Sequence, residues 1–115
     1  MLRARLIRKA PPGGPGRAVL CGYVLAGHAG YEKYGSDIVC AAVSAIAQTV
    51  LFALQDILGE DQVVCKVEEG DMRVSITPEK ALEDGPKALL RALEIGLTSI
   101  AHSYPQSVSI DDTGR

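Results

Sequence analysis

The sequence has few aromatic residues and lacks the patterns that mark a metal site or a nucleotide site. Its 115 residues include no Trp, one Phe and four Tyr, so a core must be built mainly from Val, Leu, Ile and Ala. The three cysteines form no CxxC pair and show no Cys/His spacing typical of zinc ligands. No GxxxxGK[ST] phosphate loop is present. We therefore expect no metal and no cofactor, and we disfavour a nucleotide-hydrolysing function.

The chain also lacks a large excess of positive or negative charge. Twelve basic and 14 acidic residues give a net charge of −2, so no basic field indicates direct contact with nucleic acid. The amino terminus MLRARLIRK has the charges of a signal peptide but no apolar run behind them, which argues against secretion. With an odd number of cysteines, this indicates reduced thiols and a cytoplasmic protein.

The longest apolar stretch, 38–54, is interrupted by Ser44, Gln48 and Thr49 and is shorter than the roughly 20 residues that a membrane span needs. We interpret it as a core helix and expect no membrane partner. Hydrophobic residues make up 47% of the chain and charged residues 23%, as in soluble globular proteins. Residues 1–115 fit a single domain.

Alternation of apolar and polar residues predicts the strands. The first begins at 2–6 and is followed by the breaker PPGGPG at 11–16, and the second covers 19–25. Residues 62–77 predict a hairpin that turns at Glu69-Gly70-Asp71, and 107–111 predict a short last strand.

Two helices complete the pattern. Residues 38–58 are apolar nearly all round at first and become amphipathic later, which favours a helix buried in its first half that ends at Gly59. A second helix begins at Gly85-Pro86, with leucines and an isoleucine along one side. The order ββαββα(β) predicts an α/β protein of the α+β type, in which both helices cover one face of a mainly antiparallel sheet.

The stretch GHAGYEKYGSDIVCAAVSAIAQ, residues 27–48, holds one of the two histidines and one of the three cysteines. A helix that packs on a sheet begins above the edge where the preceding strand ended. We therefore expect His28, just after the second strand, and Cys40, near the start of the first helix, to lie at the same edge of the sheet. Glycines give the intervening loop the freedom to turn back over that edge; they are Gly27, Gly30 and Gly35. We therefore expect the imidazole to approach the thiol.

This arrangement suits a nucleophilic thiol. With Ser36 or Asp37 as N-cap, Cys40 falls in the first helical turn, where unpaired N–H groups and the helix dipole favour a thiolate. His28 would stabilise the thiolate and then protonate a departing amine. Helix-start N–H groups could also stabilise an oxyanion.

Each of these residues also has a structural interpretation. Cys40 could be a small apolar core residue, as we expect for Cys21 and Cys65 on the apolar faces of their strands, and His28 a solvated turn residue. Asp37 could orient His28 or simply complement the helix dipole, and Ser44 could bond to the sulfur or to a carbonyl. Tyr31 and Tyr34 could line a substrate groove or pack at its solvent edge. His102 ends the second helix, and we assign it no chemistry.

The segment GHAGYEKYGSDIVCAAVSAI resembles the signature of the ribosomal-processing cysteine proteases (the Prp, or YsxB-like, family), in which a GHA/SG turn precedes DIVCAAVS at a helix start. His28, Asp37, Cys40 and Ser44 lie at matching positions. The PPGGPG loop and the basic first strand are not part of that signature.

The resemblance implies a small, usually dimeric α/β enzyme with Cys40 as nucleophile and His28 as base. It implies that the loop with Gly27, Gly30, Tyr31, Tyr34 and Gly35 closes around a peptide. The implied substrate is the precursor of a large-subunit ribosomal protein, the twenty-seventh in common numbering, whose N-terminal extension is cut after two aromatic residues. A non-enzymatic, ribosome-associated module that grips a peptide or a phosphate is the alternative.

Overall fold

The computed structural model describes residues 1–13, 16–27 and 36–112. Its helices and strands, in chain order, are β1 (Leu2–Lys9), β2 (Val19–Ala26), α1 (Ser36–Leu58), the 3-10 turn η1 (Glu60–Gln62), β3 (Val64–Glu68), β4 (Asp71–Ser75), α2 (Pro78–Ala81), α3 (Asp84–Ser103) and β5 (Val108–Asp112).

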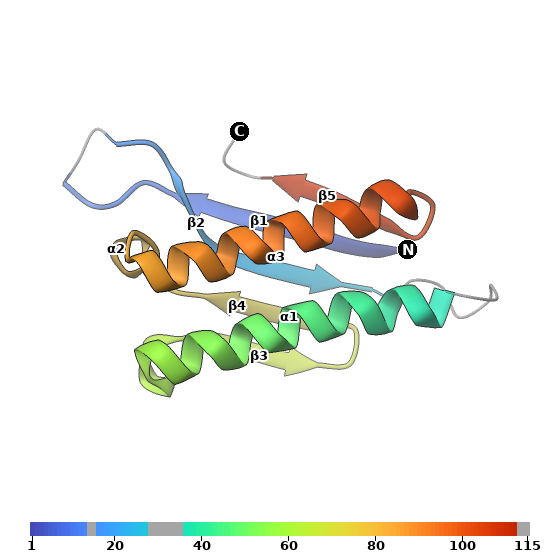
Figure 1. Cartoon of the computed structure of the whole chain (residues 1–115), viewed down its shortest axis with the longest axis horizontal. Coiled ribbons are helices and arrows are strands. Elements are labelled where there is room, and N and C mark those ends of the chain that lie inside the picture. The colour runs from blue at the N-terminus through green and yellow to red at the C-terminus, as the bar shows by residue number, and fades with distance from the viewer. Residues whose placement is uncertain (14–15, 28–35, 113–115) are drawn as a thin grey trace.

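The strands form one five-stranded sheet in the order β3-β4-β2-β1-β5. Neighbouring strands are antiparallel except for the pair of β1 and β5, which is parallel. The two long helices lie next to each other over one face of this sheet (Figure 1). The predicted two-layer α+β fold is therefore confirmed.

The core lies between the sheet and the two long helices. Alternate residues of the strands point towards the helices, so Leu6 on β1 and Tyr23 on β2 are buried. They pack in the same cluster as Val43 on α1 and Leu93 on α3, both of which are fully buried. One apolar cluster thus joins both layers.

Helix α1 is buried on one side along its whole length and not all round in its first half. Val39, Val43 and Ala47 face the core, whereas Ile38 at the start of the helix is 71% exposed. The expected burial of the first half is therefore found on one side only, because among the described residues no third layer covers the outer side of α1. By length and composition alone, Ile38–Leu58 could also cross a membrane.

Two features differ from the sequence expectation. A short helix, α2, precedes α3; it begins at Pro78, and the hydroxyl of Thr77 accepts a 3.2 Å hydrogen bond from the amide of Lys80. Helix α3 begins at Asp84, just before the predicted Gly85-Pro86.

The position of Cys65 also differs from the sequence expectation. Cys21 is buried, as predicted, but Cys65 is exposed. Cys65 pairs with Val74 across the sheet and lies on the apolar side of β3, yet β3 is an edge strand whose residues are all exposed. Its sulfur lies 3.8 Å from Nε2 of Gln55 on α1. Alternation identified the correct side of the strand but could not reveal that the strand lies at the edge.

Candidate active site

A hollow of about 260 Å³ lies at the end of the sheet where β2 ends and α1 begins. One wall is formed by Cys40, Ser44 and Gln48, which are spaced four residues apart and therefore share one side of α1. The opposite wall is the turn between β3 and β4, and Leu2 and Leu25 also line the hollow. A thiol and a hydroxyl thus face a cavity open to solvent.

Cys40 is half-buried: it packs against the core cluster and also lines this hollow. Helix α1 begins at Ser36, which makes Cys40 its fifth residue. Cys40 therefore lies one turn after Ser36, near the start of the helix.

Gly27 joins β2 to the same hollow. Its φ is 87°, a left-handed conformation that favours glycine, and a Cβ atom there would lie 2.7 Å from the carbonyl oxygen of Met1. Its amide donates a 2.9 Å hydrogen bond to the carbonyl oxygen of Gly70 in the β3–β4 turn. The chain therefore leaves β2 in a defined direction at the rim of the hollow.

Three carboxylates line the hollow from the β3–β4 turn, on Glu68, Glu69 and Asp71. Hydrogen bonds from Lys66 and Arg73 hold the pKa of Asp71 below its ordinary value, so this carboxyl is ionised at neutral pH. This negative charge favours a ligand that carries Lys or Arg.

No sequence pattern assigned a role to this acidic turn. It reaches the hollow because β4 pairs with β2, in a register that sets Ala26 opposite Asp71. The sequence predicted the hairpin but not its neighbour in the sheet. The charged turn itself, EEGD at 68–71, was the available signal.

The structure brings together part of the predicted site. Gly27, Cys40 and Ser44 line one hollow, and Asp37 lies in the first turn of α1. The other predicted residues lie outside the described part of the chain; they are His28, Gly30, Tyr31, Tyr34 and Gly35. Residues 28–35 link Gly27 to Ser36, the first residue of α1.

The described residues around the hollow offer no grouped set of metal ligands. Across residues 1–13, 16–27 and 36–112, no three His, Cys, Asp or Glu side chains are grouped as metal ligands would be. Among the described residues, Cys40 contributes a thiol to the lining of this hollow.

Comparison with known proteins points to one family. Residues 17–109 match the family model described as cysteine protease Prp. A curated relative, the ribosomal processing cysteine protease Prp of Mycoplasma pneumoniae, is 33% identical over 88 residues, which cover 75% of this chain and 81% of the relative.

Two solved structures are similar over nearly the whole chain. The protein SMU.848 of Streptococcus mutans is 29% identical, with a TM-score of 0.76 and coverage of 97% of this chain and 93% of that one. The ribosomal processing protease Prp of Staphylococcus aureus, solved with a substrate peptide, is 18% identical, with a TM-score of 0.78 and coverage of 98% and 100%. The second likeness is one of fold.

Proposed function

The chain belongs to the Prp family of ribosomal-processing cysteine proteases and is a cysteine-type peptidase, and we propose that it removes the N-terminal extension of a large-subunit ribosomal protein, the twenty-seventh, before ribosome assembly. We propose that Cys40 and His28 form its catalytic dyad. The placement of Cys40 on an open hollow beside the end of β2 is the observation that carries this proposal.

The choice of Cys40 follows from where the three thiols lie. Cys21 is buried in the core, and burial raises the pKa of its thiol, so it is a poor nucleophile. Cys65 is exposed on the edge strand and does not line the hollow. Cys40 alone among the three lines the hollow near the start of α1.

His28 is proposed as the partner because of the residues on either side of it. Gly27, immediately before it, lines the hollow that Cys40 also lines, and the hydrogen bond from Gly27 to Gly70 holds the chain at the rim. The described residues on either side of 28–35 lie near Cys40: Gly27 lines the same hollow, and Ser36 precedes Cys40 by four residues in α1. This supports an imidazole within reach of the sulfur.

The proposed reaction is acyl transfer to sulfur. The Cys40 thiolate attacks the peptide carbonyl carbon, the C–N bond breaks, and the imidazolium of His28 gives its proton to the departing amine. Neutral His28 then takes a proton from water, which attacks the thioester. The thioester C–S bond breaks, the new carboxyl terminus leaves, and the thiolate and imidazolium are restored.

The carboxylates that line the hollow from the β3–β4 turn, which we call the acidic rim, favour a substrate with basic side chains. Glu69 has no ion-pair partner in the described part of the chain, so its charge is free to meet a cation. Ribosomal proteins contact RNA phosphates through Lys and Arg, so a precursor segment of this kind matches the rim in charge.

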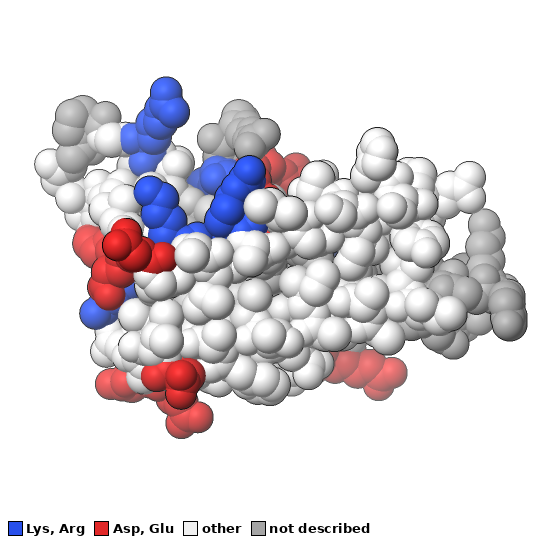
Figure 2. All heavy atoms as spheres, in the orientation of Figure 1, with Lys and Arg blue, Asp and Glu red and all other residues white. Residues whose placement is uncertain are grey.

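We also propose a cytoplasmic homodimer. The cysteines are free, as reducing conditions would keep them. On the outer side of the helical layer, Phe52 is 60% exposed and Ile95 51% exposed, and Figure 2 shows no charged residue over the middle of this face. Exposed apolar surface of this kind marks an interaction site, and a second copy of the chain is the proposed occupant.

The decisive experiment uses the extended ribosomal precursor and mass spectrometry of the products. We expect Cys40→Ala and His28→Ala each to abolish cleavage while circular dichroism remains that of the wild type. Cys65→Ser is the matched control and should cleave normally. Asp37→Asn should reduce cleavage less than either dyad variant, because Asp37 can only assist.

Other results would reject the proposal. Cleavage by His28→Ala at the wild-type rate would remove that residue from the mechanism. A wild-type protein that binds the precursor without cutting it, with an affinity that Cys40→Ala shares, would favour the peptide-binding module instead.

The dimer is tested separately by light scattering after gel filtration. Phe52→Glu should convert the dimer to a monomer, whereas Leu82→Glu, which changes a similarly exposed residue beyond α2, should not. A wild-type monomer at tens of micromolar would contradict the dimer and leave the protease assignment intact.

A further inference from the structure

A second, larger cavity lies at the end of the molecule opposite the Cys40 hollow. Its volume is about 570 Å³, which is in the range of small-molecule sites. Arg8, near the end of β1, lines this cavity, whereas Leu2 at the start of the same strand lines the Cys40 hollow. The two cavities are therefore separated by the length of β1.

The cavity combines an apolar surface with an excess of positive charge. Ala18, Val19 and Leu20 at the start of β2 face Ala81 and Ala88 from the helices. Among the charged lining residues, the cations outnumber the carboxylates by four to two: Arg8, Arg17, Lys87 and Arg91 against Asp84 and Glu94. In Figure 2, Lys and Arg gather over this end of the molecule, beside Asp and Glu.

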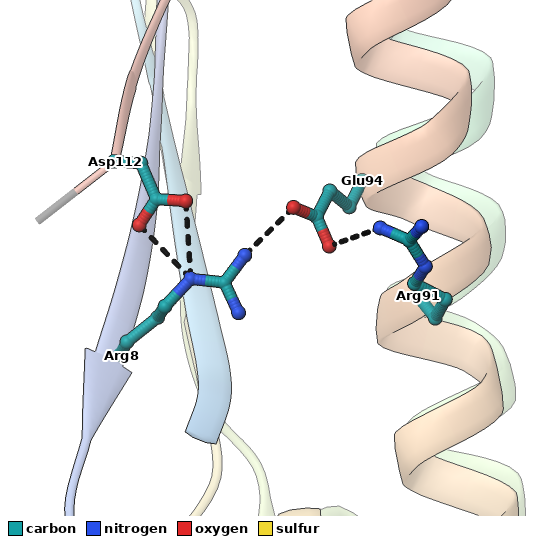
Figure 3. A network of polar contacts seen from close by, with 4 residues as sticks. All are labelled: Arg8, Arg91, Glu94 and Asp112. Atoms are coloured by element: carbon teal, nitrogen blue, oxygen red, sulfur yellow. Dashed lines mark hydrogen bonds and ion pairs between the residues drawn. The ribbon is translucent and has the colours of Figure 1, made fainter. Parts of the chain in front are cut away.

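Two of the four cations are held by a network that builds the cavity wall (Figure 3). Nη2 of Arg8 lies 2.7 Å from a carboxylate oxygen of Glu94, and Nε of Arg8 lies 3.0 Å from Asp112 on β5. The other Glu94 oxygen accepts a 2.8 Å bond from Arg91. These side chains tie β1 to α3 and β5.

The other two cations have no such role. Arg17 and Lys87 line the cavity, and neither forms an ion pair with a carboxylate in the described part of the chain. Asp84, the remaining carboxylate of the cavity, is likewise unpaired with them. Two uncommitted cations beside an apolar surface are the complement of an anionic head on an apolar body.

We propose that this cavity binds a small organic anion, whose carboxylate, phosphate or sulfonate group lies between Arg17 and Lys87 and whose apolar body packs on Val19, Leu20 and Ala88. The Arg8–Glu94–Arg91 network keeps the wall in place while leaving these two cations available. Asp84 weakens the binding. This site is independent of the protease chemistry at Cys40.

The test is a fluorescence titration of the intact protein with two probes of similar shape. Anilinonaphthalene sulfonate carries the anionic group, and phenylnaphthylamine is its neutral counterpart. We expect saturable binding of one sulfonate probe per chain, about tenfold tighter than binding of the neutral probe, because a charged group adds charge-assisted contacts. The double variant Arg17→Gln/Lys87→Gln should lose this preference, and Asp84→Asn should strengthen it.

The matched control removes the same amount of charge elsewhere. Arg3→Gln/Arg5→Gln changes two exposed residues on the other face of β1 and should bind the sulfonate probe like the wild type. Three results would overturn the proposal: equal affinity for both probes, equal losses in the two double variants, or loss of the sulfonate probe on Phe52→Ser, which would place it on the helical face. Unchanged thermal unfolding of each variant confirms that folding is not the cause.

Discussion

The hydroxyl of Tyr23 donates a 2.7 Å hydrogen bond to the carbonyl oxygen of Ala47, and both groups are fully buried. Tyr23 lies on β2, which ends at the rim of the Cys40 hollow, and Ala47 lies on α1, which carries Cys40 two turns earlier. This bond therefore helps to fix the position of α1 relative to β2, and these two elements together border the hollow.

Removal of this hydroxyl should cost stability. We expect Tyr23→Phe to lower the free energy of unfolding by about 1–2 kcal/mol, because a buried hydrogen bond is lost while the ring still fills its site. Urea denaturation measures the change. Tyr104→Phe, at a half-exposed residue, is the control and should change little. Equal stability of both variants would show that the bond contributes nothing.

The same tyrosine predicts how stability depends on pH. Burial raises the pKa of Tyr23 well above its ordinary value near 10. The folded protein then keeps this proton at a pH where the unfolded chain loses it. Stability from this group is thus complete below about pH 10 and falls above it by about 1.4 kcal/mol per pH unit. Urea unfolding between about pH 9 and 11 should show this fall for the wild type.

The fall should be smaller in Tyr23→Phe. Burial also raises the pKa of Cys21, but both proteins keep that thiol, so the difference between them isolates the tyrosine. Parallel pH profiles for the two proteins would contradict the prediction.

The Arg8 network should matter more to stability than the ion pairs at the surface. The side chains of Arg8, Glu94 and Asp112 are 15%, 10% and 17% exposed, so water screens them poorly. We expect Arg8→Met to lower the free energy of unfolding by about 2–4 kcal/mol, because two carboxylates lose their shared cation. Arg5→Met removes an exposed pair with Asp111 and should cost less than about 0.5 kcal/mol. Similar losses in the two variants would be inconsistent with this difference in burial.

The three thiols should react with iodoacetamide in a definite order. Cys21 should be inert in the folded protein because it is buried, and Cys65 should react as an ordinary exposed thiol. If His28 activates Cys40 as proposed, Cys40 should react faster than Cys65 despite being half-buried, and His28→Ala should reverse that order. Peptide mapping by mass spectrometry gives each rate. A wild-type Cys40 slower than Cys65 would argue against an activated thiol.

Local sequence patterns predicted the elements of the fold well. Alternation placed β1, β2 and the β3–β4 hairpin, and glycine and proline marked the places where strands and helices end. These signals are local because they depend on which residues share a side of a strand or helix. The short helix α2 was missed, since its cap at Thr77 and proline at Pro78 follow a strand directly.

The candidate nucleophile was also predicted from the sequence, through Cys40 at the beginning of a helix that follows a glycine-rich segment. The acidic wall of its hollow was not, and neither was the exposure of Cys65. Both depend on strand order: the pairing of β4 with β2 brings the Glu68–Asp71 turn to Cys40 and leaves β3 at the edge.

The sequence by itself determined which residues share a side of each strand and helix, and that a glycine-rich segment separates an imidazole from a thiol. Only the tertiary structure decided which strands are neighbours, which apolar side chains stay exposed, and that Arg8 lies between β5 and α3. The reason is physical: periodicity reports the direction of a side chain within its own element. What that side chain meets depends on long-range packing between elements far apart in the chain.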